Sequence, residues 1–214
     1  MKLPRRIAQR RMQYEAARVP QWEGMLSAEE LERYAAFPVE KRRREFLLGR
    51  AVLRTLAAEQ TETPPTEVPL RVAEDGAVEW VDAPHHVSLA HADTRAVAVM
   101  APFRVGVDLE QIAAYEPEVR QFALRPDELE QLGAGPLDRD AAFICIWTLK
   151  EAVLKARRTG LRTAPKRVHL DIGPDIDPEA LRGTAQVQGE AWHVAAERWD
   201  DFFLSVAWEQ DAPR

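Results

Sequence analysis

The chain has 214 residues, of which 46% are hydrophobic and 30% charged, and its formal net charge is −6. This composition is typical of a globular protein, and the length suffices for one large core or two smaller ones. No apolar run approaches the roughly 18–20 residues that a membrane span needs, and the acidic balance argues against nucleic acid as the main partner.

The charge is unevenly distributed along the chain. The first 54 residues hold 13 Lys and Arg against 7 Asp and Glu, whereas the remainder is acidic. A basic region of this kind can receive phosphates or an acidic protein, although solvated helix faces are the simpler explanation. The single cysteine, Cys145, lies in an apolar helical run and is expected to be a buried small hydrophobic residue. One cysteine excludes an internal disulfide, and a basic N-terminus without an apolar core argues against a secretory signal, so we expect a cytoplasmic location.

The predicted elements of the first half are two helices and then strands. After an irregular start, Ser27 and Glu30 form a capping-box pattern that begins one helix. A second helix is predicted over residues 39–59 from its broad apolar stripe, and the Pro-rich stretch 63–66 ends it. Strands are predicted over residues 87–90, 96–100 and 105–110.

The second half repeats this order. A helical region is predicted over residues 117–132, a Gly/Pro break follows, and a long helix spans about 138–158. Strand-like runs end the chain at residues 168–172, 192–197 and 202–208. Helices followed by strands in each half predict an α+β fold of two similar lobes, residues 1–104 and 105–214, rather than a doubly wound sheet.

The segment 106–110 (GVDLE) carries the first candidate site. Because strand side chains alternate between faces, Asp108 and Glu110 lie on one face, and Gly106 leaves room on that face for something to approach. Two carboxylates so placed are tolerated in solvent or drawn together by a cation. Taken alone, the segment favours an amphipathic strand with a wet acidic face.

The second candidate is the helical segment 147–155 (WTLKEAVLK). Trp147, Glu151 and Lys155 are spaced by four residues and share one helix face. Taken alone, Glu151 and Lys155 are an ordinary surface ion pair, worth about 0.3–0.5 kcal/mol.

Together the two segments indicate a metal–phosphate site. Three carboxylates and a lysine are the groups that hold a hard dication against a pyrophosphate. Oxygen ligands without partnering Cys or His favour magnesium, or manganese in its place, over zinc.

These two segments, with Phe143 between them, closely resemble the two signature motifs of Sfp-type phosphopantetheinyl transferases in residues, order and spacing. Upstream, residues 26–33 and the arginine-rich stretch 41–54 resemble that family's N-terminal helices. The resemblance therefore covers nearly the whole chain, and its motifs are specific in combination.

The resemblance implies two pseudo-symmetric α+β lobes with the active site in the cleft between them. It also implies transfer of the phosphopantetheine arm of the co-substrate coenzyme A to a carrier-protein serine, with release of 3′,5′-ADP. The metal-binding acids would be Asp108, Glu110 and Glu151, and Glu151 and Lys155 would be catalytic. Lys155, His91 and Arg44, the last with some ambiguity among its arginine neighbours, would contact coenzyme A phosphates.

The chain departs from the family pattern in two places. Residues 76–78 are Gly-Ala-Val where the family has Gly-Lys-Pro, and three polar side chains that usually flank the histidine motif are missing around His91. Each lost hydrogen bond is worth about 0.5–1.5 kcal/mol, so the nucleotide should be held less tightly.

The implied partner is an acyl carrier protein, or a carrier domain of a fatty acid, polyketide or nonribosomal peptide synthase. Neither nucleic acid nor a membrane is expected as a partner, and two fused lobes would let a monomer build the site. Two alternatives compete with the transferase. One is a catalytically impaired family member that binds carrier protein or coenzyme A, and the other is a magnesium-dependent nucleotide hydrolase.

Overall fold

The computed structural model describes residues 1–81, 83–173 and 181–210. Within it the chain divides into two compact units, Arg5–Pro102 and, together with Met1–Pro4, Phe103–Arg214. No described helix combines the length and the apolarity needed to cross a bilayer. As a boundary between functional domains, the division after residue 104 stays a prediction.

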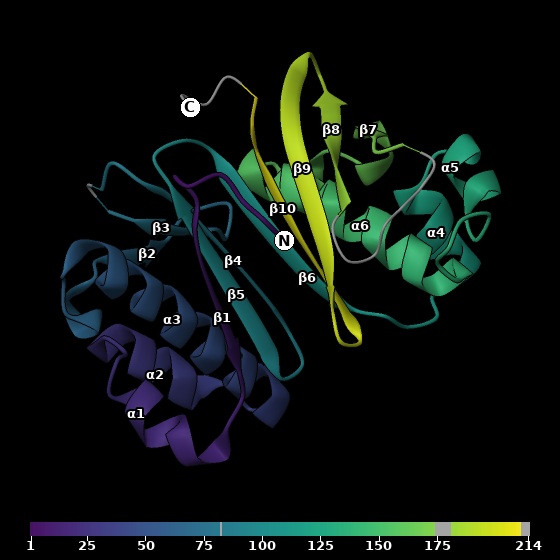
Figure 1. The fold of residues 1–214 in the computed structure, drawn as a ribbon. Helices are drawn as coiled ribbons and strands as arrows, with labels where there is room; N and C mark the ends of the chain where they lie inside the picture. Colours follow the sequence, from purple (N-terminus) through teal and green to yellow (C-terminus); the bar gives the residue numbers. More distant parts are fainter. Residues whose placement is uncertain (82, 174–180, 211–214) are drawn as a thin grey trace. The chain divides into compact units, whose positions relative to one another are not determined.

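The Arg5–Pro102 unit packs helices on one side of an antiparallel sheet of order β1-β5-β4 (Figure 1). The long helix α3 contacts all three strands. Its side chains Leu48, Val52 and Leu56 are buried with Ala96, Ala98 and other residues of β5. The elements are β1 (Ala8–Gln13), α1 (Val19–Glu23), α2 (Ala28–Ala36), α3 (Glu40–Thr61), β2 (Leu70–Val72), β3 (Val78–Trp80), β4 (His86–Ala92) and β5 (Arg95–Ala101).

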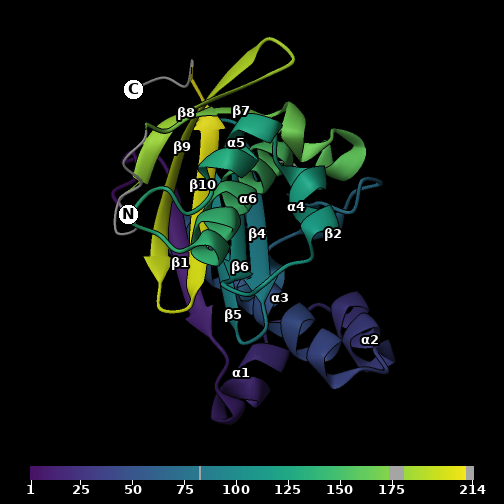
Figure 2. The same ribbon diagram turned by 90° about the vertical axis from the view of Figure 1, so that its right-hand side faces the viewer.

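The Phe103–Arg214 unit repeats this plan with a five-stranded antiparallel sheet of order β6-β10-β9-β8-β7. The long helix α6 packs along β6 and β10 (Figure 2). In both units the first strand pairs with the last, and the long helix covers that pair. The elements are β6 (Val105–Gln111), α4 (Pro117–Ala123), α5 (Pro126–Gln131), α6 (Arg139–Ala156), β7 (His169–Asp171), β8 (Leu181–Val187), β9 (Glu190–Trp199) and β10 (Phe202–Glu209). The predicted α+β class with two similar lobes is confirmed.

Most predicted elements form as expected. The capping box is present at α2, where Ser27 accepts from the backbone N–H of Glu30 and Glu30 accepts from that of Ser27. Helix α6 begins after Asp138, whose carboxylate accepts from two backbone N–H groups. Cys145 is fully buried, which raises the pKa of its thiol to about 12.

The structure also differs from the predicted elements. The irregular start is in fact strand β1, which pairs with β5 over its whole length. The single helical region 117–132 is two helices, because the Pro126 ring disfavours helical backbone at Arg125 and Pro126 begins a new helix. Strands β2, β3 and β8 were not predicted, although β2 pairs with β3 and β8 pairs with both β7 and β9.

Gly106 decides how closely α6 can approach the sheet. A Cβ atom built at this position would lie 2.1 Å from the carbonyl oxygen of Ala152 and 2.4 Å from the nitrogen of Ala156. Both neighbours are backbone atoms of α6, so neither can rotate away. The space beside Gly106 is therefore occupied by the backbone of helix α6.

We predict that Gly106→Ala lowers the free energy of unfolding by about 3 kcal/mol, because the added methyl must push α6 away from β6. Urea unfolding followed by circular dichroism measures this. The matched control is Gly24→Ala, where the added Cβ would lie 3.5 Å from its nearest neighbours, and it should change the value by less than about 0.5 kcal/mol. Equal stability of the two variants would contradict the described packing of α6.

Candidate active site

Helix α6 is anchored on its flanks by two buried polar side chains, Thr148 and Lys150. Thr148 and Ser205 of β10 share a hydrogen bond of 2.7 Å between their hydroxyl groups. The fully buried Lys150 donates to Glu128 of α5 at 2.6 Å and to the carbonyl of Ala123 at 3.1 Å. These contacts fix the rotation of α6 about its axis, and with it the direction of the neighbouring Glu151.

The face of β6 that carries Gly106 and Asp108 is turned toward α6. Asp108 pairs in register with Ser205, which bonds to α6, and neighbours in an antiparallel pair share a face. Only 4% of Asp108 is exposed. The interpretation of this face as a wet acidic surface is therefore wrong for Asp108, while Glu110 is half-buried.

Lys155 donates to Asp108 Oδ1 at 2.7 Å and not to a surface partner. The Lys155 side chain is 34% exposed, whereas that of Asp108 is 6% exposed. The simple surface ion pair between Glu151 and Lys155 is thus replaced by a contact from α6 to β6. One end of the lysine is held at the carboxylate and part of its side chain still reaches solvent.

Two carboxylate oxygens of β6 and α6 are buried without a hydrogen-bond partner: Asp108 Oδ2 and Glu151 Oε1. Burial, followed by the negative charge of Asp108, raises the pKa of Glu151 to about 7, and Lys155 offsets only part of this. Buried polar atoms are normally satisfied, and two buried acceptors without a donor suit a positively charged partner. A hard cation fits this donor set.

The three predicted metal ligands, Asp108, Glu110 and Glu151, do not form one cluster in the described part of the chain. Among residues 1–81, 83–173 and 181–210, no group of three or more His, Cys, Asp or Glu side chains is arranged to hold a metal ion. The charge of Asp108 contributes, after burial, to the raised pKa of Glu151. Glu110 shares the strand face of Asp108 but is not part of such a cluster, and its role as third ligand stays a prediction.

Tyr115 is a residue near the site that the sequence did not reveal. Burial, and then the charges of Glu110 and Asp108, raise the pKa of its hydroxyl. Its ring lies 5.4 Å from that of Phe143, which in turn lies 6.0 Å from that of Trp147. Tyr115 follows β6 in an irregular segment, so no periodic pattern could have placed it.

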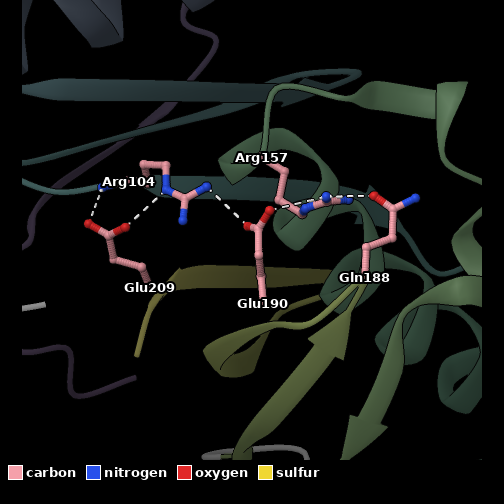
Figure 3. Close-up of polar contacts among 5 residues, drawn as sticks. All are labelled: Arg104, Arg157, Gln188, Glu190 and Glu209. Carbon is pink, nitrogen blue, oxygen red and sulfur yellow. Dashed lines mark hydrogen bonds and ion pairs between the residues drawn. The ribbon is translucent and has the colours of Figure 1, made fainter. Parts of the chain in front are cut away.

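A chain of charged side chains ties the ends of the sheet to the end of α6 (Figure 3). Arg104, just before β6, donates to Glu209 at 2.9 Å and to Glu190 at 3.0 Å. Arg157, at the end of α6, donates to Gln188 at 2.8 Å and to the same Glu190 at 3.2 Å. Burial alone would raise the pKa of Glu190, but the hydrogen bond and charge of Arg157, with the charge of Arg104, hold it below its usual value. The network fixes α6 against the strands at its C-terminal end.

Two of the three predicted phosphate contacts, Arg44 and His91, lie in the Arg5–Pro102 unit, whereas Lys155 belongs to the Phe103–Arg214 unit. Arg44 of α3 donates to Asp93 Oδ1 at 2.8 Å, in the turn between β4 and β5. His91 lies near the end of β4, where its ring is close to Gly49 of α3. Helix α3 thus brings Arg44 and His91 to the same end of β4.

Two family models match the chain. The model of the 4′-phosphopantetheinyl transferase N-terminal domain matches residues 30–101, and that of the 4′-phosphopantetheinyl transferase superfamily matches residues 104–207. The chain belongs to the 4′-phosphopantetheinyl transferase superfamily.

Two relatives carry names of the same family. A protein of Synechocystis sp., provisionally named a 4′-phosphopantetheinyl transferase, is 30% identical over 151 residues, which cover 67% of this chain and 61% of that protein. The 4′-phosphopantetheinyl transferase psf-1 of Bacillus pumilus is 26% identical over 120 residues, which cover 55% of this chain and 52% of the relative. The matched part of the chain thus spans between half and two thirds of the length of these relatives.

We predict that Glu151→Gln stabilises the metal-free protein. A carboxyl group whose pKa is raised from 4.5 to about 7 costs the folded state stability as the pH rises between these values. With chelator present, the variant should gain roughly 1–3 kcal/mol of unfolding free energy over wild type at pH 8 and nothing at pH 4. Urea unfolding at the two pH values measures this.

The matched control is Glu130→Gln, at an exposed position of α5, which should leave the difference between the two pH values unchanged. A loss of stability in Glu151→Gln at pH 8 would mean that Glu151 is not a buried, repelled carboxylate.

Proposed function

We propose that this chain transfers the 4′-phosphopantetheine arm of coenzyme A to a serine of a carrier protein and releases 3′,5′-ADP. Family membership and the names of the relatives support this proposal. The observation that carries it is the pair of orphaned buried oxygens of Asp108 and Glu151 beside Lys155, because this arrangement suits a cation and a phosphate together. Two buried carboxylates with no cation would only lower the free energy of unfolding.

Magnesium, or manganese in its place, is the metal proposed for this site. Asp108 and Glu151 would hold it, with Glu110 as a third oxygen ligand. Such an ion offsets the negative charge of a pyrophosphate and stabilises the charge that develops on the transferred phosphoryl group.

Lys155 is proposed to contact the phosphate. Its ammonium group is held by Asp108 while part of the side chain stays exposed, so it can exchange or share that partner with a phosphate oxygen. A fixed positive charge at this point favours binding of the donor and departure of 3′,5′-ADP. Arg44 and His91 are proposed to bind further phosphate groups of coenzyme A.

In the proposed reaction the serine hydroxyl oxygen of the carrier attacks the β-phosphorus of coenzyme A. The new bond joins that oxygen to phosphorus, and the bond between this phosphorus and the 3′,5′-ADP oxygen breaks. The serine proton passes to the carboxylate of Glu151, directly or through a water molecule. Lys155 balances the charge on the departing phosphate.

The nucleotide side of the site offers fewer polar groups than the family pattern. Gly76 occupies the tight turn between β2 and β3 with a φ of 84°, a conformation that favours glycine, and Ala77 follows it with no hydrogen-bonding side chain. Ala92, after His91, likewise has none. We therefore propose a donor pocket that holds the adenine end less tightly.

The partner is proposed to be an acyl carrier protein or a carrier domain of a fatty acid, polyketide or nonribosomal peptide synthase. The basic first 54 residues suit an acidic partner, with charge governing the association rate and orientation more than identity. The chain is proposed to act in the cytoplasm and as a monomer.

The test is the intact mass of apo carrier proteins after incubation with the chain, coenzyme A and magnesium. We expect a gain of one phosphopantetheine that is lost with chelator and falls at least about 100-fold in rate for Glu151→Ala. Glu130→Gln is the control that should keep the rate. If the folded protein modifies no carrier from fatty acid, polyketide or peptide synthesis, the proposal is wrong.

A further inference from the structure

The guanidinium group of Arg44 already has an anionic partner. Its Nη2 atom donates to Asp93 Oδ1 at 2.8 Å, across 49 positions of the chain. The Arg44 side chain is 24% exposed and that of Asp93 is 43% exposed, so the carboxylate is the more solvent-exposed member of the pair. On its other side, Arg44 lies over the ring of Tyr14, with its guanidinium carbon 5.4 Å from the ring centroid.

Arg44 nevertheless retains an unused donor. Its Nε atom is buried and has no hydrogen-bond partner. A guanidinium group presents its donors as a planar fork that suits two oxygens of one phosphate. The single contact from Asp93 therefore leaves this donor capacity partly unsatisfied.

His91 is a second basic side chain at this end of β4. It precedes Asp93 by two residues, and a Cβ atom at Gly49 of α3 would lie 3.4 Å from its Cδ2 atom. Helix α3 thus contacts Asp93 through Arg44 and approaches His91 at Gly49. The carboxylate has the wrong charge for a site that is to receive an anion.

The turn itself does not require an aspartate. Asp93 has a φ of 49°, in the left-handed region that glycine and asparagine also adopt readily. Either residue would close the turn between β4 and β5 without a charge. The turn therefore does not account for the negative charge of Asp93.

We propose that Asp93 competes with the phosphate of the donor for Arg44, and so limits the affinity of the site for coenzyme A and for 3′,5′-ADP. This inference rests on the proposed function, in which Arg44 binds a phosphate of the donor. The incoming phosphate displaces the carboxylate from the guanidinium group, and the carboxylate returns when the product leaves. Asp93 acts through Arg44 and is therefore a positioning residue that weakens product binding.

The experiment is calorimetric titration of the full chain with 3′,5′-ADP in magnesium buffer, for wild type and for Asp93→Asn. Asparagine keeps the left-handed turn and an acceptor oxygen but removes the charge. We expect the dissociation constant to fall about three- to tenfold, because one competing ion pair and one repulsive charge are lost together. In transfer assays, the KM for coenzyme A and the inhibition constant of 3′,5′-ADP should fall by the same factor.

Two controls make the result specific. Asp200→Asn changes another aspartate with positive φ, in the turn between β9 and β10, and should leave the affinity unchanged. In an Arg44→Gln background, Asp93→Asn should produce little of its effect, because the competed partner is gone.

The outcomes separate this inference from the proposed function. Suppose that wild type binds 3′,5′-ADP and modifies a carrier, but Asp93→Asn binds 3′,5′-ADP equally or more weakly. The proposed competition between Asp93 and the phosphate is then wrong, while the transferase proposal stands. An unchanged effect of Asp93→Asn without Arg44 would likewise overturn it. If wild type neither binds 3′,5′-ADP nor modifies a carrier, both proposals are wrong.

Discussion

The contact of helix α6 with strand β6 at Gly106 is the constraint on which the candidate site depends. Any side chain at this position would collide with the backbone of Ala152 or Ala156. Since Asp108 lies two residues along the same strand face, and Glu151 and Lys155 lie on the facing part of the helix, the close approach brings the groups together. The lysine hydrogen bond and the coupled carboxylate charges follow from this spacing.

The residues of α6 divide between holding the helix and forming the site. Thr148 and Lys150 fix it to β10 and α5, and Arg157 fixes its end to the charged network of Arg104 and Glu190. Lys155, by contrast, bonds to Asp108 of β6, and Glu151 Oε1 is buried without a hydrogen-bond partner. Two buried carboxylates at one point destabilise the metal-free fold, as is common for residues arranged for function rather than stability.

The sequence predicted the long helices well because their apolar stripes and caps are local signals. The long helices α3 and α6 form close to their predicted ranges, and the predicted capping box of Ser27 is present at α2. Strand β1 was missed because its apolar residues are too few and too mixed with arginine to show alternation, and only pairing with β5 makes it a strand.

For the site, the sequence identified Asp108, Glu151 and Lys155 as chemically related residues from spacing and family resemblance. It could not show that Asp108 is buried or that Lys155 bonds to it, because both depend on the packing of α6. Contacts between residues far apart in sequence, such as Arg44 with Asp93, have no signal in a single chain.

The most direct test of the proposed metal site is a crystal structure of the chain grown with Mn²⁺, using the anomalous signal of manganese to locate the ion. We expect a peak bound by Asp108 and Glu151, with both orphaned oxygens as ligands. A structure in which manganese binds elsewhere, while these two carboxylates stay unliganded, would contradict the proposal.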